Sequence, residues 1–204
     1  MVISAVANAV ANLVVLLLLP FGGYYLFHRW KYRRSFGEVA RRAGLQLGEA
    51  KYIAYGGGMG LLVALALAIF LRDPEPLTRE GSAMSAYAGL GLAPEVVLVA
   101  LIYGVVKTGF CEELLFRGLI AGSLGRRLRL PWANLWQALI FLLPHLALLV
   151  FAPELWPLLL LVFAFGLFKG WLRIRSESIV GPWLLHAIGN VTAVLLVATR
   201  GVPT

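Results

Sequence analysis

Charged residues are scarce in this sequence. Asp, Glu, Lys and Arg make up 14% of its 204 residues, whereas a soluble globular domain usually has about 25%. There is a single aspartate, Asp73, and a single cysteine, Cys111, which excludes a catalytic pair of aspartates and an internal disulfide. The rest is apolar, with 60% hydrophobic residues and a mean hydropathy of +0.84. This composition is typical of a multi-span membrane protein and excludes an ordinary soluble enzyme.

Several apolar segments are long enough to cross the hydrocarbon core of a bilayer, which takes about 20 helical residues. They show no strict alternation of apolar and polar residues, so we expect helices and not barrel strands. The predicted fold is an all-α polytopic membrane protein of about six transmembrane helices. We expect one integral-membrane domain over 1–204, a motif-bearing core at 94–199, and a short cytoplasmic interfacial helix within 35–50. The six expected spans are 4–27, 52–71, 94–122, 135–152, 157–174 and 179–199.

Most of the 18 basic residues fall on one side of this arrangement. Positive residues favour the cytoplasmic side of a membrane, so we expect both ends of the chain to face outward. The net charge of +8 is then explained by topology and by contact with anionic lipids, and not by nucleic acid. A composition rich in Ala, Gly and Leu, with more Arg than Lys, suggests a prokaryotic cell membrane. The basic residues assigned to the cytoplasmic side are Arg29, Lys31, Arg33, Arg34, Arg41, Arg42, Lys51, Arg126, Arg127, Arg129, Lys169, Arg173 and Arg175.

A few polar side chains lie inside the expected spans, where they are costly and therefore functional candidates. Glu113 and Arg117 are four residues apart, so they share a helix face and can form an ion pair. Glu112 faces elsewhere and has no partner on its own helix. At 1.5 Å per residue, Glu112 comes to a depth similar to that of the polar residues of two other spans. The full set is Lys107, Glu112, Glu113 and Arg117 in the third span, His145 in the fourth, and His186 and Asn190 in the sixth.

Residue chemistry alone leaves several interpretations open. Glu112, His145 and His186 could together ligate zinc, as in His₂Glu hydrolases, although the HExxH motif is absent. Lys107, Glu112 and His145 could relay protons in a transporter, but the sequence has no internal repeat. Each polar pair could also be a structural clamp between helices. Cys111 is better suited to packing than to nucleophilic attack, since it lies beside an acid in an apolar span.

The same residues form three motifs in a fixed order. The sequence reads EELLFR from Glu112, FLLPH from Phe141 and HAIGN from His186. It resembles the CPBP family of CAAX-prenyl-protease and bacteriocin-processing intramembrane endopeptidases, whose motifs are EExxxR, FxxxH and HxxxN/D. The resemblance covers about 112–190, and Lys107 stands outside it.

This resemblance implies a glutamic-type intramembrane endopeptidase. Its substrate would be membrane-associated, either a prenylated CAAX C-terminus or a leader or bacteriocin-like peptide. Glu112 and His145 would activate the water. His186 and Asn190 would stabilise the oxyanion of the tetrahedral intermediate. The implied supporting residues are Glu113, Arg117 and Phe141.

We expect no metal and no other cofactor. Asn190 shares a helix face with His186, and an amide is a poor zinc ligand but a good hydrogen-bond donor. The expected partners are membrane lipids and a membrane-anchored or lipidated peptide, with no nucleic acid. Two alternatives remain: a zinc-dependent protease built on Glu112, His145 and His186, and a non-proteolytic membrane scaffold or immunity protein.

Overall fold

The computed structural model describes residues 2–79, 82 and 84–201, and these form helices joined by turns. Within them there is no strand, and six helical segments are long and apolar enough to cross a membrane. The predicted all-α class and the predicted number of spans are therefore confirmed. The six segments are Val2–Tyr32, Ala50–Phe70, Pro94–Gly125, Leu130–Val150, Pro153–Ser176 and Val180–Arg200.

Most spans combine more than one helical element. Span one consists of α1 (Val2–Asn12), η1 (Leu13–Leu18) and α2 (Leu19–Tyr32), and span two is α4 (Ala50–Phe70). Span three consists of α6 (Pro94–Leu101), η3 (Ile102–Phe110), η4 (Glu113–Ala121) and α7 (Gly122–Gly125). The later spans consist of α8 (Leu130–His145) with α9 (Leu148–Phe151), then η5 (Pro153–Leu155) with α10 (Trp156–Ser176), then α11 (Val180–Arg200). Three short helices lie between spans: α3 (Phe36–Arg42), α5 (Glu75–Thr78) and η2 (Ser85–Tyr87).

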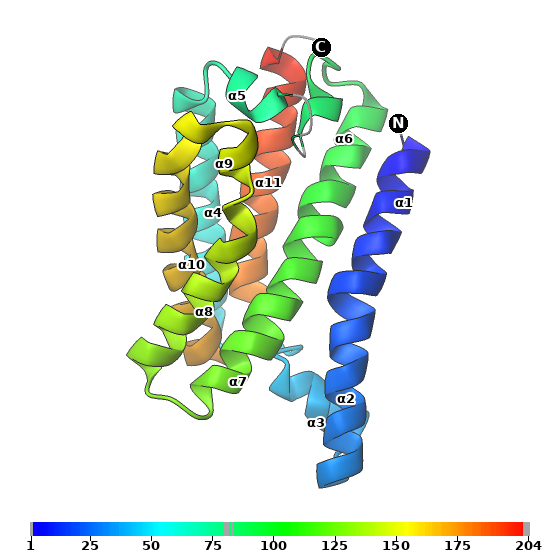
Figure 1. Ribbon diagram of the computed structural model, residues 1–204, viewed down its shortest axis with the longest axis vertical. Coiled ribbons are helices and arrows are strands. Elements are labelled where there is room, and N and C mark those ends of the chain that lie inside the picture. Colours follow the sequence, from blue (N-terminus) through cyan, green and yellow to red (C-terminus); the bar gives the residue numbers. More distant parts are fainter. Residues whose placement is uncertain (1, 80–81, 83, 202–204) are drawn as a thin grey trace.

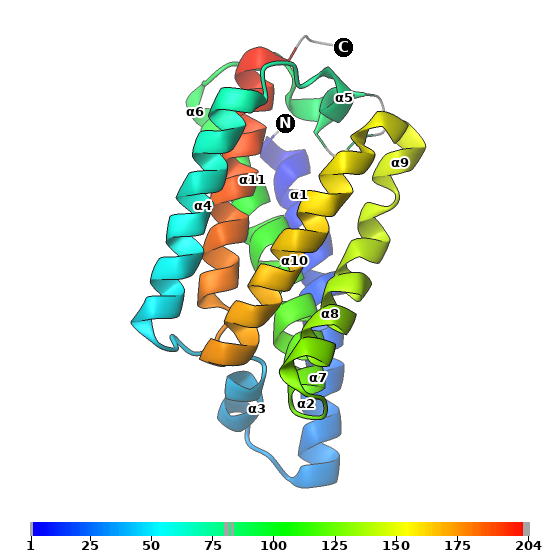
Figure 2. The ribbon, with the colours of Figure 1, turned by 90° about the vertical axis from the view of Figure 1, so that its left-hand side faces the viewer.

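The last helix lies in the middle of the bundle. It packs against α4 on one side and against η3 on the other, while α10 pairs with α8 and span one lies outside span three (Figures 1 and 2). Spans three and six are the most buried of the six, and span one is the least buried. The helices that carry two of the three motifs therefore form the core.

Helix α1 begins and helix α11 ends at the same end of the bundle. This end also holds α5 and α9, whereas α3 and α7 lie at the opposite end (Figure 1). This arrangement agrees with an even number of spans. Which end faces the cytoplasm stays a prediction from the distribution of basic residues.

Small residues let α4 and α11 approach closely. Gly56 and Gly60 lie one turn apart on α4 and face α11, and a methyl group at Gly56 would collide with the carbonyl group of Gly181. Glycines at this spacing are a common means of close packing between membrane helices. The contact brings α11, and with it His186, into the centre of the molecule.

Span three departs from the regular α-helix that the sequence analysis assumed. Its elements η3 and η4 have π-helical turns, with hydrogen bonds between residues five apart. Gly109 suits such a turn, because a Cβ atom there would collide with the carbonyl oxygen of Gly104, five residues earlier. The wider turns still leave Glu113 and Arg117 in contact, with 3.2 Å between Oε2 and Nε.

The short helix expected within 35–50 forms only over α3. The Ser35 side chain accepts a hydrogen bond from the Glu38 backbone, and the Glu38 carboxylate accepts one from the Ser35 backbone, which starts the helix. Gly44, with φ of 82°, lies just beyond its end. A short helix is therefore confirmed, and its position at a cytoplasmic interface stays a prediction.

Candidate active site

Glu113 is the centre of a buried ionic cluster. Its side chain has no exposed surface, and three basic groups from three helices surround it. The Lys169 Nζ atom and the His186 Nδ1 atom each lie 2.7 Å from Oε1, and Arg117 Nε lies 3.2 Å from Oε2. Since a buried carboxylate is tolerated only when it is paired, these contacts explain how Glu113 stands inside a membrane span.

The aromatic ring of Phe141 covers this cluster. The Arg117 guanidinium carbon lies 3.8 Å from the ring centroid and Lys169 Nζ lies 4.7 Å from it. Cations over an aromatic face are attracted by the ring quadrupole. The ring centroid of Phe141 is also 4.5 Å from that of His145 and 6.4 Å from that of His186. Phe141 thus connects the ionic cluster to both histidines.

Glu112 has a different environment from its neighbour. Its side chain is 21% exposed, and the nearest cationic or titratable nitrogen is His186 Nε2, 3.9 Å from Oε2. Among the described residues Glu112 has no ion pair with lysine or arginine, whereas Glu113 has one with each. Of the two adjacent carboxylates, only Glu112 is open to a water molecule or a substrate.

The hydrogen bond made by His145 indicates which ring nitrogen carries the proton. Its Nδ1 atom lies 2.8 Å from the carbonyl oxygen of Phe141. A carbonyl oxygen only accepts hydrogen bonds, so Nδ1 is the protonated nitrogen. In the neutral ring the lone pair is then on Nε2, which can accept a proton from a bound water.

His186 is oriented by Glu113. The 2.7 Å contact between Nδ1 and Oε1 requires the Nδ1 proton to point at the carboxylate, because two unprotonated acceptors would repel each other at this distance. The 3.2 Å contact of Lys169 Nζ with the same Nδ1 is then a close approach and not a second hydrogen bond. It follows that Nε2 donates a hydrogen bond only when the ring carries a second proton.

Asn190 is held by a residue that the sequence analysis did not select. Its amide nitrogen donates to Thr108 Oγ1 at 2.8 Å, and the Thr108 hydroxyl donates to the Tyr103 carbonyl at 2.8 Å. One N–H of the amide remains for another acceptor. A signal was present in the sequence, since Thr108 lies four residues before Glu112 on the same span.

Lys169 was placed incorrectly by the sequence analysis. It was counted with the basic residues at the cytoplasmic end of its span, but it is only 3% exposed and pairs with Glu113. Arg173 is also buried, at 4% exposed, but it lies in the last turn of α10 as expected and donates to the Arg42 carbonyl. The predicted sidedness therefore loses only the support of Lys169. The error arose because hydropathy does not show whether a basic side chain near the end of a span points outward or turns inward to a buried partner.

Span three also contains Cys111 and Lys107, whose surroundings bear on the roles expected for them. Cys111 is fully buried, which agrees with the packing role expected for it. Lys107, for which the sequence suggested only a role as a charge partner, lies with Nζ 5.2 Å from the ring centroid of Tyr103.

Within the described part of the chain, no three His, Cys, Asp or Glu side chains are grouped closely enough to hold a metal ion.

The structure brings most of the expected site residues together. Glu113 contacts Arg117 and His186, and the ring of Phe141 lies against Arg117 and both histidines. Glu112 faces His186, and Asn190 lies one helical turn beyond His186. Residues 94–192 match the family model described as type II CAAX prenyl endopeptidase Rce1-like. This part of the chain belongs to that family.

The family predicted from the three motifs is thus confirmed. The Rce1-like family is a protease family, and six apolar helices identify an integral multi-pass membrane protein. No curated protein and no solved structure matches the chain. The Rce1-like match includes every candidate site residue but leaves spans one and two outside.

Proposed function

We propose that this protein is a glutamic-type membrane endopeptidase that hydrolyses a peptide bond near the end of a membrane-anchored, prenylated peptide. The main support is the contrast between the two adjacent glutamates. Glu113 is buried and paired with Arg117, Lys169 and His186, whereas Glu112 is partly exposed beside His186. The Rce1-like match supports the reaction class and the prenylated substrate.

The proposed reaction begins with a water held between Glu112 and the unprotonated Nε2 of His145. Glu112 takes a proton from the water, whose oxygen attacks the carbonyl carbon of the scissile peptide bond. The carbonyl oxygen becomes an oxyanion, which accepts a hydrogen bond from the remaining N–H of Asn190 and from His186 when its ring is protonated. The proton taken by Glu112 then passes to the leaving amine as the C–N bond breaks.

A cleavage assay tests this proposal directly. The full-length protein in detergent is incubated with a farnesylated peptide ending in a CAAX sequence, and with the same peptide lacking the lipid. We expect the prenylated peptide to be cleaved by the wild type and not by Glu112→Ala, and we expect a chelator to leave the rate unchanged. Purified protein is also expected to contain no stoichiometric zinc.

Other outcomes of this assay favour the alternatives. One zinc ion per chain, with activity lost on chelation and restored by Zn²⁺, would replace the glutamic mechanism by the zinc-dependent one. Cleavage of a leader or bacteriocin-like peptide in preference to the prenylated one would change the substrate class. Binding without cleavage of any of these peptides would indicate the non-proteolytic scaffold.

A second prediction concerns the oxyanion. Asn190→Ala is expected to lower kcat by about 10²–10³, because that is the usual cost of removing one oxyanion donor, with KM little changed. Thr108→Val is the matched control, since it removes the acceptor that orients Asn190 but leaves the amide in place. We expect Thr108→Val to have the smaller effect on kcat. Equal losses in both variants would show that the Asn190–Thr108 pair is only a clamp between helices.

A further inference from the structure

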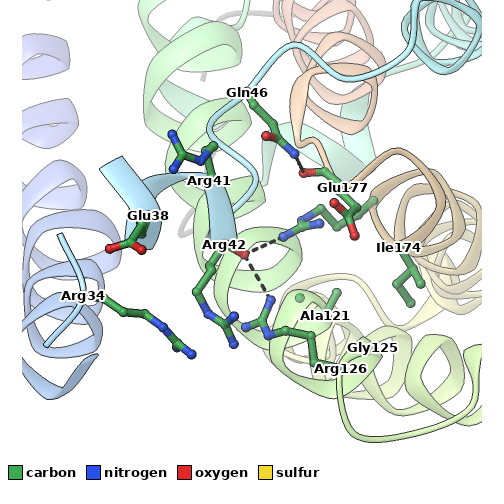
Figure 3. Close-up of a pocket in the computed structure, with 12 residues that line it drawn as sticks. Arg34, Glu38, Arg41, Arg42, Gln46, Ala121, Gly125, Arg126, Ile174 and Glu177 are labelled. Atoms are coloured by element: carbon green, nitrogen blue, oxygen red, sulfur yellow. Dashed lines mark hydrogen bonds between the residues drawn. The ribbon is translucent and has the colours of Figure 1, made fainter. Parts of the chain in front are cut away.

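A basic cavity lies at the end of the bundle opposite the chain ends, away from the proposed active site. Its volume is about 420 Å³, and it is enclosed by the segment after α2, by α3, by α7 and by the end of α10 (Figure 3). None of the proposed catalytic residues lines it. The charged and amide side chains that line it are Arg34, Glu38, Arg41, Arg42, Gln46, Arg126, Arg173 and Glu177.

The arginines of this cavity lack anionic partners. Among the described residues, none of the lining arginines forms an ion pair with Glu38 or Glu177. Hydrogen bonding by Ser35, first from its backbone, holds the pKa of Glu38 below its usual range, so this carboxylate is already engaged. Figure 3 shows the guanidinium groups of Arg34, Arg42 and Arg126 directed towards the same space. An anion in that space would reduce the repulsion between them.

Two of the arginines are fixed by the protein. Arg173 Nη2 and Arg126 Nη1 both donate to the carbonyl oxygen of Arg42, at 2.8 and 3.1 Å, and Arg126 Nη2 donates to the Tyr24 hydroxyl at 2.8 Å. Gly122 makes room for Arg173, since a Cβ atom there would lie 2.7 Å from Nη2. The cavity is therefore a built feature, with cations held in place before any ligand arrives.

Some donors in this arrangement remain unused. Arg173 is 4% exposed, yet its Nε–H has no hydrogen-bond partner among the described residues, and the same holds for the buried Nε–H of Arg42. Burial, and then the nearby Arg42 and Arg34, lower the pKa of Arg126. These two buried N–H groups leave the guanidinium groups of the cavity wall incompletely hydrogen-bonded by the protein. Guanidinium groups match phosphate oxygens in both charge and geometry.

The depth of the cavity favours a lipid as the source of that phosphate. It lies where spans one, three and five end, on the side that the basic residues assign to the cytoplasm, and Trp30 and Trp171 lie near the same ends. Tryptophans mark the level of the lipid headgroups, and basic pockets between helices at this level bind anionic headgroups. We propose that the cavity binds the phosphate of an anionic phospholipid headgroup.

An equilibrium binding experiment tests this. Full-length protein in a neutral detergent at 0.15 M salt is titrated with short-chain phosphatidylglycerol, with phosphatidylcholine of the same chain length, and with inorganic phosphate. The pocket variant is Arg34→Gln with Arg126→Gln, which replaces one half-buried and one exposed arginine of the cavity. The matched control is Arg29→Gln with Arg127→Gln, which removes the same charge near the same end but outside the cavity.

We expect phosphatidylglycerol to bind the wild type and the control equally well. We expect it to bind the pocket variant about 25-fold more weakly, at roughly fivefold for each arginine. Phosphatidylcholine and inorganic phosphate should bind far more weakly. Equal losses in the two double variants would overturn the proposal in favour of diffuse charge attraction. Inorganic phosphate that binds as tightly as the lipid would overturn the lipid source. A pocket variant that raises KM for the prenylated peptide but keeps phosphatidylglycerol binding would assign the cavity to the peptide carboxylate.

Discussion

Replacing Glu112 with glutamine is expected to remove the proposed peptidase activity and to leave the protein folded. Glutamine has the size of glutamate but cannot take a proton from water, so the proposed general base is lost. Loss of such a base usually costs about 10²–10⁴ in rate. Because Glu112 has no lysine or arginine partner and is 21% exposed, no buried cation loses its partner. The measurement is kcat on the prenylated peptide together with the thermal unfolding midpoint in detergent.

Glu113→Gln is the matched control for this variant. It makes the same chemical change at the next position, where the carboxylate is fully buried among three basic groups. We expect it to lower the unfolding midpoint, and to reduce activity only as far as His186 loses its orientation. An inactive, fully stable Glu113→Gln beside an active Glu112→Gln would reverse the roles assigned to the two glutamates.

The positions of the spans were predictable because long apolar runs determine where a membrane helix lies. The expected span at 179–199 and the observed Val180–Arg200 differ by one residue at each end. Span one ends five residues after the expected 27, and span four begins five residues before the expected 135. The motif order also predicted which residues belong together, and the structure joins Glu113, Arg117, His145 and His186 in one cluster around Phe141. Both predictions depend on the sequence of each helix alone, namely the length of its apolar run and the motif that it contains.

Features that depend on how helices face one another were not predicted. The pairing of Lys169 with Glu113 requires a particular rotation of α10 against span three, and hydropathy contains no information on rotation. Thr108 became relevant only when α11 brought Asn190 next to it. The π-helical turns of span three were missed for a related reason, because residue spacing does not distinguish helices of slightly different pitch.

Removing the carboxylate of Glu113 is expected to cause the largest loss of stability. In Glu113→Ala, Arg117 and Lys169 remain buried, with exposures of 0% and 3%, and lose their shared anion. Leaving a buried charge unpaired usually costs about 3–5 kcal/mol. For a chain of this length that corresponds to a fall in the unfolding midpoint on the order of 10 °C. Thermal unfolding of the purified protein in detergent measures it.

A double-mutant cycle separates this effect from simple loss of packing. Lys169→Met keeps the length of the side chain and removes its charge, while Glu113 keeps Arg117 as a partner. If the ion pair between the two residues is what stabilises the cluster, the double variant Glu113→Gln with Lys169→Met should lose less free energy of unfolding than the sum of the losses in the two single variants. The expected difference is about 0.5–3 kcal/mol. The reason is that the second substitution removes one of the cations left unpaired by the first. Strict additivity would mean that Lys169 and Glu113 contribute independently, and that the buried cluster does not act as a unit.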